Sequence, residues 1–240
     1  MAGPARAAMT DPKIAAGAPG AAGGAEAALV LATWFSPSYP VGAYSYSHGL
    51  EWAVESGAVT GRATAETWVR GCLAQGAGWT DAVLLARGMD AAQAGDDAPF
   101  DGLAALAEAL APARERHLET MAQGAAFARV TGAVWPEAGS APLAYPLAVA
   151  RAAAARGLPP RLVLGFFLHG FAANLVSAAV RLVPLGQTDG QRILAALLPL
   201  CEELAERALS AGEEEIGGCT LLADIAAMRH ETQYSRLFRS

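Results

Sequence analysis

The chain has 240 residues, 53% of them hydrophobic and 17% charged, with a formal net charge of −6 at pH 7. This length allows one large domain with a sizeable core. The acidic balance argues against nucleic acid as a main partner, because phosphate binding needs clustered basic residues. Lys13 is the only lysine, and it does not follow a glycine-rich turn, so nucleotide hydrolysis through a P-loop is excluded.

Cysteine usage and the first apolar run indicate a cytoplasmic protein. Cys72, Cys201 and Cys219 lie far apart and form no Cys-x-x-Cys pair, which is typical of reduced proteins. The apolar run 27–35 is preceded by Glu26 and followed by Ser-Pro, unlike the cleavage site of a signal peptide.

Alanine and leucine are abundant, isoleucine is rare, and no stretch alternates as a strand would, so helix is expected nearly everywhere. The predicted fold is an all-α, single-domain orthogonal bundle of roughly nine to ten helices. We expect a disordered leader at 1–24, a helical body at 25–212, and a hinge with a C-terminal tail at 213–240. Within the body and tail, the expected helices are about 26–35, a short helix ending at 56, 64–75, 80–93, 101–111, 113–131, 143–155, 160–183, one starting at a Thr188–Gln191 capping box, and 221–230.

The segment 160–183 is the expected central helix. It has no formal charge between Leu162 and Val180, so its hydropathy alone would fit a membrane span. Its residues, however, sort onto two faces at helical spacing. The first is a small and polar stripe of Gly170, Asn174, Ser177 and Arg181, and the other is a leucine-rich face made of Leu164, Leu168, Ala172, Leu175, Ala179 and Leu182. This pattern favours the core helix of a soluble protein over a span.

Two segments are candidates for binding a partner. The loop 36–51 combines two prolines, two glycines and three tyrosines, and Tyr44, His48 and Glu51 are its candidate contact residues. The chain ends in large aromatic and arginine side chains, which interface hot spots use, whereas termini normally fray. Both segments have a plainer interpretation: the loop could staple two helices, and the tail could fold back onto its own core. The candidate docking residues of the tail are Arg229, His230, Tyr234, Arg236, Leu237, Phe238 and Arg239.

Catalytic and metal-binding signatures do not appear in the sequence. His48, His117, His169 and His230 form no His-x-x-x-His or Cys–His pair at ligand spacing. Ser45 lacks the Gly-x-Ser-x-Gly spacing of a nucleophile elbow. We therefore predict no catalytic residue, no resident metal and no cofactor. A helical enzyme with a pocket of perturbed acid–base groups stays open as an alternative.

Three segments together resemble the urease accessory protein UreF family. They are Ser36-Pro-Ser-Tyr-Pro-Val-Gly-Ala-Tyr-Ser-Tyr-Ser-His-Gly-Leu-Glu51, the segment 174–191 that begins Asn-Leu-Val-Ser, and the segment 224–240 that contains Arg-His-Glu-Thr-Gln-Tyr-Ser-Arg-Leu-Phe. The resemblance runs from about residue 28 to the end of the chain.

The resemblance implies a non-enzymatic, all-helical homodimer that joins a UreD-type protein (also called UreH) and the GTPase UreG. Such an assembly activates apo-urease by GTP-dependent nickel insertion, with UreE as the nickel donor. The tail 228–240 is implied to dock on the UreD-type partner, and the loop with Tyr44 and His48 is a candidate for the face that receives UreG. A catalytic arginine for the GTPase, from Arg229 or Arg236, stays open. The alternative function is a chaperone that itself carries nickel on His48, His230 or Cys219.

Overall fold

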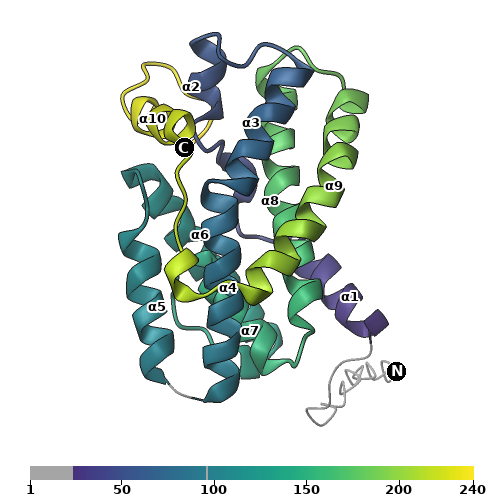
Figure 1. Cartoon of the computed structure of the whole chain (residues 1–240), viewed down its shortest axis with the longest axis vertical. Helices are drawn as coiled ribbons and strands as arrows, with labels where there is room; N and C mark the ends of the chain where they lie inside the picture. Colours follow the sequence, from purple (N-terminus) through teal and green to yellow (C-terminus); the bar gives the residue numbers. More distant parts are fainter. Residues whose placement is uncertain (1–23, 96) are drawn as a thin grey trace, which may run out of the picture.

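The computed structural model describes residues 24–95 and 97–240, and this part of the chain is a bundle of ten α-helices without a β-strand (Figure 1). The predicted all-α fold is confirmed. The expected leader lies outside the described residues, except for Gly24, which begins the first helix. The elements are α1 (Gly24–Trp34), η1 (Ala43–Ser45), α2 (Leu50–Glu55), α3 (Arg62–Ala74), α4 (Ala77–Ala94), α5 (Asp97–Ala109), α6 (Arg114–Val134), η2 (Pro136–Ala138), α7 (Tyr145–Ala155), α8 (Pro160–Leu182), α9 (Gln187–Ser210), η3 (Glu213–Glu215) and α10 (Leu221–His230), where η marks a 3-10 helix.

Helix α8 forms at the predicted place and is a core helix of the bundle. It begins at Pro160, where a missing N–H costs nothing, and ends at Leu182. Leu164, Leu168 and Leu175 on its leucine-rich face are completely buried. The helix packs against α9, α3 and α4, so its apolar surface is covered by neighbouring helices.

Among the described residues, α8 is the one helix long and apolar enough to cross a membrane, and half of its most apolar window is buried inside the protein. Length and composition alone do not separate a span from the core helix of a soluble protein. The neighbours that cover its leucine-rich face account for the apolar composition.

The first turns of α3 and α4 differ from the prediction. The helix expected at 64–75, with Thr64 as its cap, begins earlier, at Arg62; the N-cap is Gly61, and Thr64 lies in the first turn. Its hydroxyl accepts the backbone N–H groups of Thr60 and Gly61 at 3.0 and 3.1 Å, so Thr64 reaches back from the third helical position to the residues before the helix. The start of α4 at Thr80 is also wrong, because the helix begins one turn earlier, at Ala77.

Two other boundaries were predicted incorrectly. The residues 97–99 belong to α5 rather than to a loop, and Pro99 is tolerated because it lies in the first turn. Residue 96 lies outside the described residues. The Thr188 capping box does not form, since α9 begins at Gln187 with Gly186 as its N-cap, and Thr188 is exposed.

Glycines allow the closest helix contacts of the body. A Cβ on Gly88 of α4 would lie 2.8 Å from Leu147 and 2.9 Å from Ala150, both on α7. A Cβ on Gly124 of α6 would lie 1.9 Å from the backbone oxygen of Leu143, just before α7. These helices approach each other at distances that only glycine permits.

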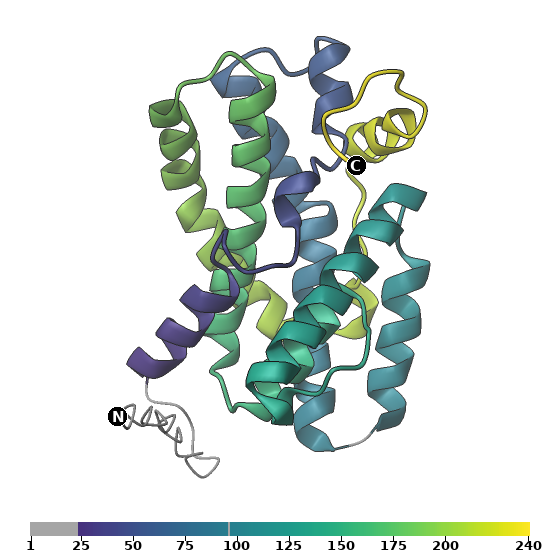
Figure 2. The ribbon, with the colours of Figure 1, turned by 180° about the vertical axis from the view of Figure 1, so that it is seen from behind.

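The chain after α9 returns across the body. Trp79 donates its indole N–H to the backbone oxygen of Glu215 at 3.1 Å, and Ile216 packs against the core. Helix α10 follows with the predicted bounds 221–230 and packs on α2 and α6. Figure 2 shows the last residues of the chain beside the segment that leads into α2.

Replacing Gly124 with Ala should destabilise the fold by about 1–3 kcal/mol or more, because the new methyl group meets a backbone carbonyl that cannot swing aside. Urea unfolding of the two proteins measures the difference. Gly165→Ala is the matched control: Gly165 is in α8 with nothing within 4 Å of the position that the added methyl group would take, so this variant should be up to about 1 kcal/mol more stable. Equal stability of Gly124→Ala and the unchanged chain would contradict the close approach.

Candidate functional site

The last ten residues lie against the body and pair with the loop 36–51. The backbone N–H of Arg239 donates to the oxygen of Ser45 at 2.7 Å, and the N–H of Ser47 donates to the oxygen of Ser240 at 2.6 Å. Ser240 also donates its hydroxyl to Glu119 at 2.9 Å and is completely buried. The tail is therefore tied to both the loop and α6.

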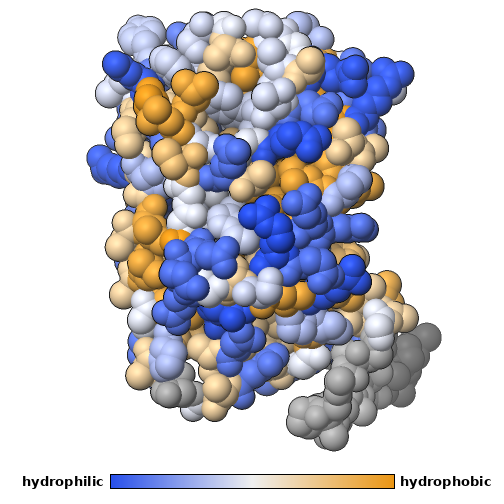
Figure 3. All heavy atoms as spheres, viewed as in Figure 1, coloured by the Kyte–Doolittle hydropathy of each residue, from blue (hydrophilic) through white to orange (hydrophobic). Residues whose placement is uncertain are grey.

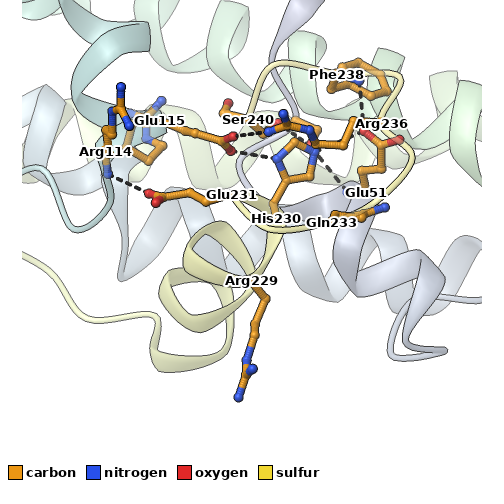
Figure 4. A network of polar contacts seen from close by, with 12 residues as sticks. Glu51, Arg114, Glu115, Arg229, His230, Glu231, Gln233, Arg236, Phe238 and Ser240 are labelled. Atoms are coloured by element: carbon orange, nitrogen blue, oxygen red, sulfur yellow. Dashed lines mark hydrogen bonds and ion pairs between the residues drawn. The ribbon is translucent and has the colours of Figure 1, made fainter.

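Two buried carboxylates on the body receive the tail (Figure 4). Glu51, in the first turn of α2, accepts the backbone N–H groups of Leu237 at 2.6 Å and Phe238 at 2.8 Å. Glu115, in the first turn of α6, accepts the guanidinium of Arg236 at 2.7 Å. Charge-assisted hydrogen bonds of this kind are stronger than those between neutral groups.

His230 joins the two carboxylates. It is the last residue of α10, and its side chain is 0% exposed. Its Nδ1 lies 2.6 Å from Glu115 Oε2, and its Nε2 lies 3.1 Å from Glu51 Oε2. The imidazole thus bridges α2 and α6, as Figure 4 shows. We call this arrangement the tail clamp. It consists of the side chains of Glu51, Glu115, His230 and Arg236 and the backbone of 237–238.

The turn before α2 places Glu51. His48 has φ 53°, a left-handed conformation that is uncommon outside glycine, and Gly49 follows with φ 73°. A Cβ on Gly49 would also lie 2.5 Å from the backbone nitrogen of Ala227 in α10. Glycine is therefore needed here both for the turn and for the close approach of α10.

A second buried cluster on α6 lies beside the tail clamp. The Glu119 carboxylate pairs with Arg116 and lies 2.9 Å from His48 Nε2. Burial by itself would raise the pKa of Glu119, but Arg116 and His48 outweigh it and lower that pKa to about 2. Burial and the charge of Arg116 lower the pKa of His48, which favours the neutral form of its imidazole.

Two cavities meet at this second cluster. One, of about 160 Å³, lies under the 217–227 segment, and the other, of about 290 Å³, lies under the loop 36–51. His48, Asp81, Arg116 and Thr120 line both. Burial raises the pKa of Asp81 to about 7, because it outweighs the attraction of Arg116.

The predicted tail residues divide into two groups. His230 and Phe238 are buried in the fold, and the Phe238 ring lies 4.2 Å from the guanidinium carbon of Arg181. The others lie at the surface. Tyr234 is fully exposed, Arg236 is half exposed while it holds Glu115, and Arg229 points away from the clamp (Figure 4); Leu237 and Arg239 are also exposed.

The predicted loop residues divide in the same way. Tyr44 is exposed, and its backbone oxygen accepts a 2.8 Å hydrogen bond from Arg181 of α8. His48 and Glu51 point inward to the clusters described above. The carboxylates Glu115 and Asp81 were not among the predicted site residues, since nothing in their spacing separates them from carboxylates on a solvated helix.

Helix α10 presents a row of large apolar side chains to solvent. Figure 3 shows apolar atoms gathered at the upper left, where Figure 1 places α10. Leu222 is 73% exposed, and its neighbours at helical spacing are also open to solvent. We call this surface the α10 patch, and it consists of Leu221, Leu222, Ile225 and Met228.

The described residues contain no group of three or more His, Cys, Asp or Glu side chains that could together hold a metal ion. The residues considered for nickel lie in different surroundings. His48 is bound to Glu119, His230 to Glu51 and Glu115, and Cys219 is an exposed free thiol. The geometry therefore does not bring His48, His230 and Cys219 into one ligand set.

Comparison with known proteins places the chain among accessory proteins of one kind. A family model described as UreF matches residues 59–198. A urease accessory protein UreF of Rhodopseudomonas palustris is 50% identical over 232 residues, which cover 92% of this chain and 98% of that protein. The proteins of the same name from Ruegeria pomeroyi and Bradyrhizobium diazoefficiens are 50% and 46% identical, over 88% of this chain and over 96% and 90% of their own lengths.

Replacing Asp81 with Asn should make stability less sensitive to pH. The pKa of Asp81 is about 7 in the folded chain, against an ordinary value of 3.8. Between about pH 4 and pH 7 the folded chain therefore keeps a proton on Asp81 that the unfolded chain has lost. The unchanged chain therefore loses stability as pH rises from about 4 through 7, by up to about 4 kcal/mol. Asp81→Asn removes this loss, so its stability relative to the unchanged chain should grow between pH 4 and pH 8.

Denaturant unfolding at several pH values measures this trend, and Asp101→Asn, at an exposed position of α5, is the matched control. A constant difference between Asp81→Asn and the unchanged chain from pH 4 to 8 would show that Asp81 is ionised throughout.

Proposed function

This chain belongs to the UreF family of urease accessory proteins, and from that premise we propose that it is a cytoplasmic, non-enzymatic adaptor in urease maturation. In this role it joins a UreD-type accessory protein and the GTPase UreG, and it acts as a homodimer. The assembly inserts nickel into apo-urease at the expense of GTP, so nickel is the cargo of the whole complex. The chain lacks a P-loop, which agrees with nucleotide chemistry in a partner.

The observation that carries this proposal is the α10 patch together with the exposed part of the tail. Large apolar side chains that form a contiguous exposed surface mark interaction sites on soluble proteins. Tyr234 lies near the patch in sequence and is fully exposed, and tyrosine is enriched among interface hot spots. We assign this surface to the UreD-type partner.

The loop around Tyr44 supports a second contact, to the GTPase. Tyr44 is exposed, while its backbone is held by Arg181 and its neighbour Ser45 is held by Arg239. An exposed aromatic side chain on a fixed backbone loses little entropy on binding. We propose that this loop contributes to the face that receives UreG.

Arg229 is the better candidate for a catalytic arginine in the GTPase. Arg236 is engaged with Glu115 inside the clamp and would have to leave it. The Arg229 side chain has no ion pair to any described residue and points outward (Figure 4). A guanidinium delivered to a transferring phosphoryl group accelerates GTP hydrolysis by about 10³–10⁵.

The double variant Leu221→Ser with Leu222→Ser should fold normally but lose the UreD-type partner. Both side chains are exposed, so their removal costs the folded chain little, whereas a hot spot costs about 2 kcal/mol or more in binding. Co-purification of tagged chain with the partner, combined with thermal unfolding, measures both effects. Leu29→Ser, at an equally exposed leucine of α1, is the control. Unchanged co-purification of the double variant would rule out the α10 patch as this contact.

Arg229→Ala should lower GTP hydrolysis by the assembled complex about 10³-fold without preventing assembly. Single-turnover hydrolysis, measured after the complex has been isolated, separates the chemical step from recruitment of the GTPase. Arg192→Ala, at an exposed arginine of α9, is the matched control. If the complex assembled with Arg229→Ala hydrolyses GTP at the unchanged rate, Arg229 is not a catalytic arginine for the GTPase.

A further inference from the structure

The protonation state of His230 determines which hydrogen bonds the tail clamp can make. Both ring nitrogens of His230 face carboxylate oxygens, Glu115 Oε2 at 2.6 Å and Glu51 Oε2 at 3.1 Å. A neutral imidazole has one N–H, whereas an imidazolium has two. The number of protons at His230 therefore depends on whether the two carboxylates are acceptors.

The other contacts of the two carboxylates answer this question. Glu51 accepts the backbone N–H groups of Leu237 and Phe238, and Glu115 accepts the guanidinium of Arg236. These three partners can only donate, and they contact both oxygens of Glu51 but only Oε1 of Glu115. Nε2 of His230 therefore donates to Glu51, and Nδ1 faces the other oxygen of Glu115, Oε2, at 2.6 Å. With Glu115 ionised beside Arg236, Nδ1 also donates and the side chain is an imidazolium.

We propose that His230 is a pH-sensitive latch, whose protonated form holds the tail in the clamp and whose deprotonation releases it. The latch concerns how this chain holds its own tail and does not depend on which partner the α10 patch binds.

The charged groups around the latch balance only while His230 is protonated. From α2, Glu51 faces the ring, and Glu55 is turned to Gln233. From α6, Glu115 faces the ring, Arg114 meets Glu231 through its backbone N–H, and Arg116 and Glu119 pair with each other one turn away. From the tail, Arg236 contacts Glu115. The clamp thus contains two cations, His230 and Arg236, against two anions, Glu51 and Glu115.

Loss of the His230 proton has two local consequences. The clamp then has two anions and one cation, and a nitrogen lone pair points at a carboxylate oxygen across a hydrogen-bond distance. Water cannot compensate, because the His230 side chain is 0% exposed. Opening the tail lets solvent reach Glu51 and Glu115, so the deprotonated form favours the open state.

The direction of the pH effect follows from this balance. Docking requires the His230 proton, so the tail is held at lower pH and released as pH rises. The equilibrium constant for opening should increase by up to about tenfold per pH unit once release is coupled to loss of one proton.

Nuclear magnetic resonance on the full chain labelled with ¹⁵N tests the latch. While the tail is docked, both ring nitrogens of His230 should give imidazolium signals, and the amides of Leu237 and Phe238 should be protected from exchange, relative to the intrinsic rate at each pH. As pH rises, loss of the imidazolium signals and loss of this protection should share one midpoint. Neutral-imidazole signals while the tail is docked, or protection that outlasts deprotonation, would overturn the proposal.

Variants at the clamp sharpen the test. His230→Gln cannot become a cation, so amides 237 and 238 should exchange fast at every pH, without the pH step. Glu115→Gln lets a neutral His230 accept an amide N–H, so it should flatten the step even though the histidine is present. His169→Gln, at an exposed histidine of α8, is the control and should keep the step. If His230→Gln keeps the same pH step as the unchanged chain, another group is responsible and the latch is wrong.

Discussion

The structure around the tail depends on one constraint: three carboxylates, Glu51, Glu115 and Glu119, are buried and must be met by donors. An ionised carboxylate without partners in a protein interior costs several kcal/mol, so burial is possible only with compensation. Arg116 and His48 supply it for Glu119 from the body. For Glu51 and Glu115, nearly all donors come from residues 230–238. The tail is therefore part of the charge balance of the fold.

The same constraint connects two surfaces that are far apart in sequence. The tail donates to Glu51 in α2 and pairs with the backbone of Ser45 and Ser47 in the preceding loop. It also continues directly from α10. Helix α10 and the loop are thus joined by way of Glu51 and the tail through hydrogen bonds of 2.6–3.1 Å. A partner on one surface and a partner on the other would both act on the tail clamp.

The sequence predicted the helices well and the buried charges poorly, for a physical reason. Helical periodicity and breakers such as Pro112, Pro160 and Gly57 are local signals, and they located α8 and α10 within a residue or two. The boundaries near Pro99 and Thr188 were wrong because a first helical turn tolerates proline and a threonine is not obliged to cap. The family resemblance was found from the residues of the loop 36–51, the segment 174–191 and the segment 224–240.

The buried carboxylates of the candidate site could not be predicted from residue spacing along the sequence. Arg116 and Glu119 are three residues apart, a spacing that by itself indicates only a weak pair along one helix. In the structure both are buried, because the tail and the loop cover that end of α6. Which helix face a distant segment will cover depends on tertiary packing. The sequence therefore indicated that the tail is special, but the carboxylates that receive it became visible only in the fold.

The arrangement of α10 itself argues that this helix is shaped for an external partner. Its buried face consists of Ala226, Ala227 and His230, and the alanines fit against the close turn at Gly49. Its exposed face consists of the large residues of the α10 patch. Folding alone favours the opposite order, with large apolar side chains inside, as on the leucine-rich face of α8. Since burial of the small face and of His230 already fixes α10 on the body, the large side chains add nothing to that contact. Their burial would contribute stabilising free energy in the complex with a partner that we propose for this patch.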